Sequence, residues 1–430
     1  LAGCEAAWQI AQRGIRVNLF EMKPLKFTPA HKNKGFAELV CSNSFKAKRV
    51  DSASGLLKEE MRLLGSLLVP CANECQVPAG GALAVDREKF SLLVTKKIRE
   101  NQLINIVEKE VTSLPKSGIT IIATGPLTTK ALSKHIKALC GGYLSFYDAA
   151  APIVSRESID MSRAFLASRY NNGNDFAYIN CPMNEEEYDE FYSELISAER
   201  ALVNDFDIDN PKVYEGCMPI EVMAKRGKDT LRYGPMKPVG LYDPISGKRP
   251  FAVLQLRQEN KEGTLYNLVG FQTNLKWGEQ RRVFSFIPAL KNANFIRYGV
   301  MHRNTFIDSP NLLNLDFSLR KNNDIFFAGQ ITGVEGYMES AASGIMAGIN
   351  AVLRLKGNKP FLLPNFTMIG ALSYYISSGC ISKFQPMGAN FGILPSIYPP
   401  IRDKKLRYEA FANRSINFLK EICYNYENNS

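Results

Sequence analysis

A buried strand that breaks at glycine and leads into a helix of small residues is the feature that most constrains this fold. Residues 324–330, Asp-Ile-Phe-Phe-Ala-Gly-Gln, are apolar enough for a strand inside a sheet, and residues 340–350 follow as a helical run of small side chains. A helix that starts after such a turn presents backbone N–H groups and its positive dipole end to a phosphate. The segment therefore predicts an α/β fold with a dinucleotide site. The turn residues expected at the cofactor are Gly329, Gln330, Thr332 and Gly333.

The start of the chain carries a second signal of the same kind. Residues 4–13 have helical spacing, and residues 15–20 form a strand that ends in Glu21. This is the back half of a dinucleotide-binding βαβ unit, in which Gly3 is the last glycine of the loop and Glu21 holds a ribose hydroxyl. The first strand and the first two glycines are missing, so we expect an N-terminal truncation of roughly ten residues. The alternative is an ordinary helix–strand pair with a solvated Glu21.

Two other stretches suit a flat ligand. Residues 120–126 form a buried strand ending in Ala-Thr-Gly, a recurrent signal in two-dinucleotide-domain flavoproteins that puts Thr124 and Gly125 beside the cofactor. Residues 77–87 form a glycine-rich turn before a helix that Asp86 caps. Glycines let a backbone approach a ligand closely, although from this stretch alone an ordinary tight turn is preferred. The turn residues considered are Ala79, Gly80, Gly81, Ala82 and Leu83.

The pattern changes between residues 150 and 317. Short strand-like runs alternate with loops, and one long acidic helix, residues 184–200, interrupts them. This mixture predicts an α+β domain inserted into the nucleotide-binding fold. The expected division is a first nucleotide-binding part at 1–150, the insertion at 151–317, a second nucleotide-binding part at 318–352 and a mostly helical C-terminal region at 353–430.

Within the insertion, Cys217 lies between Gly216 and Met218-Pro219, in a context that presents a side chain at a loop tip. Glu215 and Glu221 flank it, and Lys225, Arg226 and Lys228 follow. Basic groups near a thiol lower its pKa and attract an anionic polymer. Cys217 is therefore a candidate nucleophile. The alternative, a small buried apolar residue, stays open on local sequence.

Cys41 is the second cysteine with a plausible electropositive setting. It lies in residues 23–52, a stretch too long for a simple connector, and the basic run Lys46, Lys48 and Arg49 follows it. Local sequence favours a buried, inert thiol over a reactive one.

Composition limits the partners. The chain has 430 residues and no apolar run long enough to span a bilayer. Its formal net charge of +11 favours a polyanionic partner such as nucleic acid. Its nine cysteines show no framework or zinc spacing, so reduced thiols in a cytoplasm and no metal site are expected. Aromatic residues alternate with arginine and amide side chains at 257–304, which suits a stacked base. Of the three histidines, only His302 lies in such a setting, and a structural role for it is the alternative.

These motifs together closely resemble the methylenetetrahydrofolate–tRNA-(uracil-5-)-methyltransferase family, the folate- and FAD-dependent RNA methyltransferases of bacteria. The matching runs span nearly the whole chain in order, among them FAELVCSNS, VPAGGALAVDR, IIATGPLT, EGCMPIEVMAKRG, VGFQTNLKWGEQ, RYGVMHRNTFI, FFAGQITGVEGY and FQPMGANFGILP. That coverage is far more specific than a lone glycine loop.

The resemblance implies a glutathione-reductase-like FAD domain with an inserted second domain. It implies an enzyme that forms 5-methyluridine with FAD, methylenetetrahydrofolate and NADH or NADPH, on the T-loop uridine of tRNA or on ribosomal RNA. Cys217 matches the cysteine that adds to carbon 6 of uracil, and Cys41 matches a second functional cysteine. Glu21, Gly329, Gln330 and the turn 79–83 match FAD contacts, and His302 is suited to stack on the pterin. Because the first strand is missing, we expect the chain as given to bind FAD poorly.

Three other functions compete with this one. A flavoprotein that modifies the wobble uridine of tRNA would share FAD and folate, but no match to its long C-terminal partner-binding region is found. A non-catalytic RNA-binding remnant is disfavoured by the retained Cys41 and Cys217. A plain NADH oxidase would need neither Cys217 nor a basic surface.

Overall fold

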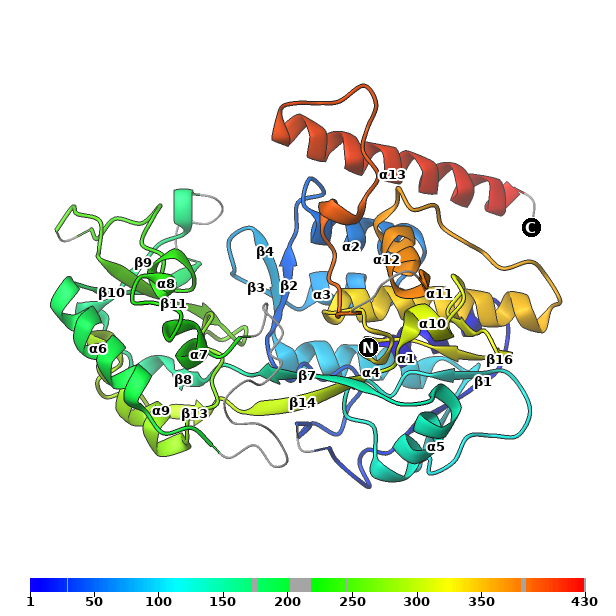
Figure 1. Ribbon diagram of the computed structural model, residues 1–430, viewed down its shortest axis with the longest axis horizontal. Helices are drawn as coiled ribbons and strands as arrows, with labels where there is room; N and C mark the ends of the chain where they lie inside the picture. Colours follow the sequence, from blue (N-terminus) through cyan, green and yellow to red (C-terminus); the bar gives the residue numbers. More distant parts are fainter. Residues whose placement is uncertain (29, 172–176, 202–217, 245, 380–383, 429–430) are drawn as a thin grey trace.

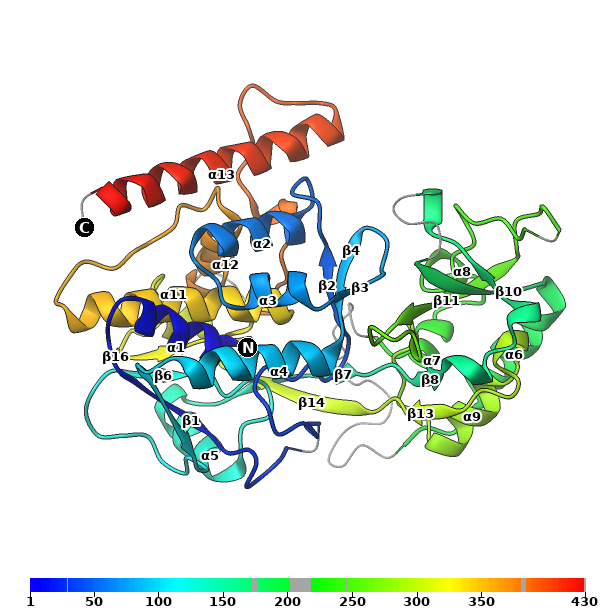
Figure 2. The same cartoon turned by 180° about the vertical axis from the view of Figure 1, so that it is seen from behind.

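In the computed structural model the elements gather into two groups joined by a long antiparallel pair, β7 and β14 (Figure 1). The structure describes residues 1–28, 30–171, 177–201, 218–244, 246–379 and 384–428. The joining strands are β7 (Leu144–Ala149) and β14 (Met301–Phe306). Together they lead the chain out of the larger group and back into it (Figure 2). No helix in these described ranges combines the length and apolar character needed to cross a membrane.

The larger group is built on parallel strand pairs covered by helices. β1 pairs in parallel with β5, and β16 pairs in parallel with β6 and antiparallel with β15. The strands are β1 (Val17–Glu21), β5 (Ile104–Glu108), β6 (Thr120–Ile122), β15 (Ser318–Leu319) and β16 (Asn322–Phe327). The helices are α1 (Ala2–Gln12), α4 (Arg87–Glu100), α5 (Lys130–Cys140), α10 (Ser309–Leu312) and α11 (Tyr337–Leu355). The predicted α/β class is therefore present, including the helix–strand order of α1 and β1.

Helices α1 and α11 pack in close contact because glycine and alanine face each other. A Cβ added at Gly344 would lie 2.3 Å from the backbone oxygen of Ala2, and one at Gly348 would lie 2.7 Å from that of Ala6. Such separations are sub-van der Waals, so no side chain larger than hydrogen fits. The small residues of the predicted helix thus have a packing reason: they bring the start of α1 against α11.

The smaller group holds a six-stranded sheet in the order β13-β8-β12-β11-β10-β9, with antiparallel pairing throughout. Its strands are β8 (Ile153–Ser155), β9 (Phe165–Leu166), β10 (Tyr178–Met183), β11 (Ala252–Gln258), β12 (Leu265–Leu268) and β13 (Phe295–Arg297). Its helices are α6 (Glu185–Ser197), α7 (Ile220–Ala224), α8 (Thr230–Tyr233) and α9 (Trp277–Phe284). They enclose a separate hydrophobic core with Tyr188, Phe191, Phe271 and Phe284 fully buried.

A small antiparallel sheet, β2-β4-β3, lies on the side of the larger group that faces the smaller one (Figure 1). Its strands are β2 (Ser44–Ala47), β3 (Gln76–Val77) and β4 (Ala82–Val85), and α2 (Ala53–Leu63) and α3 (Leu68–Glu74) accompany it. Residues 23–52 therefore contribute a strand to this sheet instead of forming one continuous loop.

The C-terminal helices α12 (Met368–Ser377) and α13 (Lys404–Asn428) are tied to α2 through a buried carboxylate. Glu60 accepts hydrogen bonds from the backbone N–H groups of Met368 and Ile369 and from the hydroxyl of Ser415, at 2.6, 2.8 and 2.5 Å. Burial raises the pKa of Glu60 to about 7, against the effect of these donors. One side chain thus links three helices that are far apart in the sequence.

Two predicted helix starts are confirmed by their caps. Asp86 accepts hydrogen bonds from the backbone N–H groups of Glu88 and Lys89 at the start of α4. Asn184 and Glu187 form a reciprocal capping box at the start of α6.

The α1–α11 contact gives a test of the fold. Gly344→Ala should lower the midpoint of chemical unfolding, because the new methyl group meets backbone atoms and overpacking costs about 1–3 kcal/mol. Gly278→Ala is the matched control, since Gly278 lies on the exposed face of α9 with nothing within 4 Å of the added Cβ. The control should be neutral or slightly stabilising. Equal unfolding midpoints for the two variants would contradict this packing.

Candidate functional site

The predicted cofactor residues of three separate segments meet where strands β6 and β16 end. The N–H of Ala328 donates to the carbonyl of Ile122 at 3.0 Å, so the two strand ends run side by side. A Cβ on Gly3 would lie 3.6 Å from Ala123 Cβ, and one on Gly329 would lie 3.1 Å from Ala2 Cβ. The structure therefore brings together Gly3, Thr124, Gly125 and Gly329, as the sequence motifs imply.

The turn after β16 is held by its own side chains. Gly329 has φ +86° and its N–H donates to Ser343 Oγ at 2.7 Å, while Thr332 Oγ1 donates to the Gly329 carbonyl at 2.8 Å. Gln330 Nε2 donates to Glu335 Oε2 at 2.6 Å. A Cβ on Gly333, with φ +85°, would lie 2.4 Å from the Phe384 ring. Glycine is thus required twice in this turn.

The same place fits the adenosine diphosphate half of a dinucleotide cofactor. Helix α11 begins after this turn, and its N-cap residue Gly336 has no side chain that could cap it. A helix start of this kind suits a pyrophosphate. Glu21 ends β1 and accepts from the N–H of Lys23 at 3.1 Å, which leaves carboxylate capacity for a ribose hydroxyl. A Cβ on Gly125 would meet open space.

The glycine-rich turn lies elsewhere, against the smaller group. The carbonyl of Ala79 accepts from the Tyr178 hydroxyl at 3.0 Å, and the carbonyl of Gly81 accepts from the N–H of Lys48 at 2.9 Å. Gly80 has φ +54°, and a Cβ on Gly81 would meet open space. Ala82 and Leu83 are strand residues of β4 instead of turn residues, and Leu83 is buried.

Cys41 lies between this turn and the start of α11. Its Sγ is 2.9 Å from the hydroxyl of Tyr337, which also accepts from the N–H groups of Cys41 and Ser42 at 2.9 and 3.3 Å. The thiol is half-buried, and the tyrosine begins the small-residue helix. Burial raises the pKa of Tyr337 well above its ordinary value, so its hydroxyl is neutral at physiological pH.

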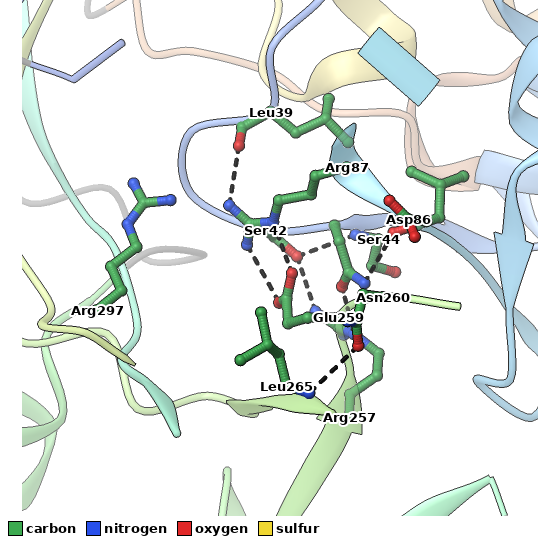
Figure 3. Close-up of polar contacts among 12 residues, drawn as sticks. Leu39, Ser42, Ser44, Asp86, Arg87, Arg257, Glu259, Asn260, Leu265 and Arg297 are labelled. Carbon is green, nitrogen blue, oxygen red and sulfur yellow. Dashed lines mark hydrogen bonds and ion pairs between the residues drawn. The ribbon is translucent and has the colours of Figure 1, made fainter. Parts of the chain in front are cut away.

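Three arginines from distant segments surround the Cys41 loop (Figure 3). Arg87 Nε lies 2.7 Å from Glu259 Oε2, where Glu259 is buried and the Arg87 side chain is 14% exposed. Arg257 donates to Asn43 Oδ1 and Ser42 Oγ at 2.8 and 2.9 Å, and Arg297 donates to the carbonyl of Val40 at 2.6 Å. None of these arginines was among the residues expected at the site. A charged residue inside the apolar strand β11 was the available signal for Arg257.

The basic run that follows Cys41 in the sequence is not the source of positive charge beside its thiol. Lys46 pairs with Glu339 at 2.8 Å, Lys48 Nζ donates to Gln76 at 2.7 Å, and Arg49 pairs with Asp51. The local basic run is therefore bound to other partners, and the cations around the thiol come from α4, β11 and β13.

Cys217 and Glu215 lie outside the described residues. Glu221 does not face solvent beside the thiol: it is buried and accepts from Thr273 Oγ1 and from the N–H of Asn274, at 2.9 and 2.8 Å. The residues that come after position 217 line a hollow of about 660 Å³. They are Met218, Met223, Arg226, Gly227, Lys228, Asp229, Thr230, Tyr233 and Gly234. Lys225, Arg226 and Lys228 are exposed, and Lys228 pairs with Asp189 at 2.6 Å.

The aromatic residues of the smaller group form a stack that ends at the surface. Trp277 is 63% exposed and lies parallel to Tyr298, which stacks in turn on Phe295, with ring centroids 5.7 and 5.5 Å apart. His302 lies on β14 opposite Asp148 of β7, and its side chain is outside the description. Among the described residues no three of histidine, cysteine, aspartate and glutamate gather as a metal site.

The chain is similar to known proteins over nearly its whole length, and these similarities show its family. A family model described as glucose inhibited division protein A matches residues 1–359. A protein of Acetivibrio thermocellus named methylenetetrahydrofolate--tRNA-(uracil-5-)-methyltransferase TrmFO is 61% identical over 427 residues, 99% of this chain and 97% of that protein. Proteins of the same name from Halalkalibacterium halodurans and Bacillus pumilus are 56% and 57% identical, each over 98% of this chain. The chain belongs to this family.

Solved structures agree on the fold. The structure of Aquifex aeolicus GidA in its form II crystal superposes with a TM-score of 0.71 at 16% identity, over 98% of this chain and 72% of that one. The form I crystal gives a TM-score of 0.67. The predicted fold class is thus confirmed by a structural match to the GidA fold.

The buried ion pair at this site gives a second test. Glu259→Gln should lower the free energy of unfolding by about 3–5 kcal/mol, because it leaves the Arg87 charge buried and uncompensated. Glu262→Gln is the control three residues away, where an exposed carboxylate pairs with the exposed Lys89. The control should unfold like the parent chain. If both variants unfold alike, the Arg87–Glu259 pair is not a structural contact.

Proposed function

We propose that this chain is an FAD-dependent RNA methyltransferase that forms 5-methyluridine, with methylenetetrahydrofolate as one-carbon donor and NADH or NADPH as reductant. The observation that carries the proposal is the 61% identity, over nearly the whole chain, to a protein named for that reaction on tRNA. Its substrate is tRNA, with the T-loop uridine as the target. The enzyme works in the cytoplasm, where its RNA substrate is found.

Cys217 is the nucleophile in this proposal. Carbon 5 of uracil is a weak nucleophile until a thiolate adds at carbon 6 and pushes its electron pair toward carbon 5. Carbon 5 then takes the one-carbon unit and loses its proton, and the thiolate leaves as the ring double bond is restored. The exposed Lys225, Arg226 and Lys228 support this role, because they follow the thiol and suit a phosphate backbone.

FAD would supply one-carbon carriage and a hydride when bound. Gly3, Glu21 and the turn from Gly329 to Gly333 would hold its adenosine diphosphate half, with the start of α11 toward the pyrophosphate. The Cys41 loop, Tyr337 and the turn at 79–83 would border its reactive end. His302 would stack on the pterin of the folate.

The division of labour follows the chain organisation. Residues 151–317 are proposed to carry Cys217 and the RNA contacts, while 1–150 and 318–352 hold the cofactor. The two hydrophobic cores support such a division, since each group of elements is packed internally. Ribosomal RNA is the alternative substrate, because the net charge of +11 attracts any RNA.

The test is methyl transfer to RNA. The purified chain with FAD in excess, NADH and labelled methylenetetrahydrofolate should label unmodified tRNA at a single uridine and leave ribosomal RNA unlabelled. Labelling of ribosomal RNA alone would replace the tRNA assignment. NADH consumption without labelling of either RNA would favour the oxidase.

Cys217→Ala should abolish RNA labelling and leave NADH oxidation unchanged, since the thiolate acts only on uracil. Cys75→Ala is the control, because Cys75 is half-buried at the end of α3 with its pKa raised by burial. Labelling that persists in Cys217→Ala would remove Cys217 from the reaction.

A further inference from the structure

The loop that carries Cys41 is held at each of its residues by a side chain from another part of the chain. The contacts are Arg87 Nη1 to Leu39 O at 2.8 Å, Arg297 Nη2 to Val40 O at 2.6 Å, Cys41 N to Tyr337 Oη at 2.9 Å, Arg257 Nη2 to Ser42 Oγ at 2.9 Å and Arg257 Nε to Asn43 Oδ1 at 2.8 Å. Three of the four holding side chains are guanidinium groups. Neutral hydrogen-bond donors would be enough to hold a loop in place. The use of three cations therefore needs a further reason.

The charges around the loop do not balance. Glu259 is the carboxylate of this cluster, and it is already paired with Arg87. Arg257 is 8% exposed, and its guanidinium donates to the neutral oxygens of Ser42 and Asn43. Burying a cation without a nearby anion is costly. Among the described residues, Arg257 and Arg297 therefore form no ion pair with a carboxylate, although the more distant Glu259 also acts on both charges.

Other charged and titratable groups at the loop do not cancel this excess. From α11, Tyr337 is neutral, and Glu339 is paired with Lys46 of β2. From α4, Asp86 accepts backbone N–H groups and Lys89 pairs with Glu262. From β10, the Tyr178 hydroxyl donates to the carbonyl of Ala79, and burial raises its pKa, so it is neutral as well. Among the described residues of the cluster, the thiol of Cys41 is the remaining group that can become an anion.

The hydrogen bonds of Tyr337 agree with an anionic sulfur. Its oxygen has two lone pairs, and the N–H groups of Cys41 and Ser42 both donate to it. The hydroxyl proton is then directed at Cys41 Sγ, 2.9 Å away. The sulfur is thus placed as the acceptor, which is the role that a thiolate fills better than a thiol.

We infer that Arg257 and Arg297 are positioning residues that hold Cys41 as a thiolate in a fixed loop. This inference deepens the proposed function, in which Cys41 is the second functional cysteine. When the thiolate forms, the S–H bond breaks, the sulfur keeps the electron pair and the proton passes to solvent. No oxidant or reductant is required.

The electrostatics of the arginines point the same way. Burial lowers the pKa of Arg257 and of Arg297, and the charges of Glu259 and, to a smaller extent, Cys41 act to raise each of them again. For Arg87, burial lowers the pKa, but the Glu259 carboxylate more than offsets this and the net direction is upward. The attraction is mutual, so the same cations that a thiolate stabilises also favour the thiolate form of Cys41.

The test is the pH dependence of alkylation at Cys41 in the purified full-length chain, without RNA or folate. Iodoacetamide reacts with the thiolate, and trypsin releases residues 35–46, a peptide whose single cysteine is Cys41, for quantification by mass spectrometry. Arg257→Gln should move the midpoint of the rate profile to higher pH and slow alkylation at pH 7 by about tenfold or more. Arg257→Lys should recover part of the rate, because it keeps the charge.

Arg49→Gln is the matched control. Arg49 is nearer to Cys41 in sequence but is exposed and paired with Asp51, so its profile should match the parent chain. Arg297→Gln is the second variant should Arg257→Gln fail to fold by circular dichroism. The inference is overturned if the folded arginine variants keep the parent midpoint, or if Arg49→Gln shifts it equally. Because no methyl transfer is measured, these outcomes are independent of whether the RNA assay succeeds.

Discussion

The Arg87–Glu259 ion pair is the contact on which the geometry of the site depends. Arg87 is the first residue of α4 in the larger group, and Glu259 directly follows β11 of the smaller group. One neighbouring contact reinforces it: Asp86 accepts from the N–H of Lys261. Because the Arg87–Glu259 pair is desolvated, the two groups stabilise each other only in one geometry. A shift of either group would leave the other charge desolvated and unpaired. The pair therefore fixes how the insertion meets the Cys41 loop.

The cofactor end depends on a different constraint, the absence of side chains between α1 and α11. Gly344 and Gly348 let the start of α1 pack directly against the middle of α11, with Ala2 beside Gly329 at the end of β16. The site thus has two parts. Close backbone packing of α1, α11 and the end of β16 builds a part that is suited to phosphates, and the arginines around the Cys41 loop build a part that is suited to a thiolate. The Cys41 loop and Tyr337, the first residue of α11, connect the two parts.

Much of this architecture was predictable from sequence because local signals determine it. Apolar strands that break at glycine, a helix of small residues and the caps at Asp86 and Asn184 all depend on neighbours in the chain. The positive-φ glycines of the turn after β16 were predictable for the same reason. The environment of Cys41 was not, because Arg87, Arg257 and Arg297 reach it through tertiary structure. The nearby Lys48 and Arg49 misled the interpretation, since an adjacent basic residue can bond elsewhere. The burial of Glu221 could not be predicted either, because it follows from the packing of α7 against residues 273 and 274.

The chemistry assigned to the chain requires that Cys217, and no other cysteine, bonds to the target base. Trapping on RNA that carries 5-fluorouridine measures this directly, because fluorine at carbon 5 cannot leave as a proton does and the sulfur–carbon bond persists. The account predicts a covalent protein–RNA complex, formed only with cofactor and folate present, whose digestion maps the linked nucleotide to Cys217. A complex mapped to Cys41, or the absence of any complex from an enzyme that methylates ordinary RNA, would contradict it.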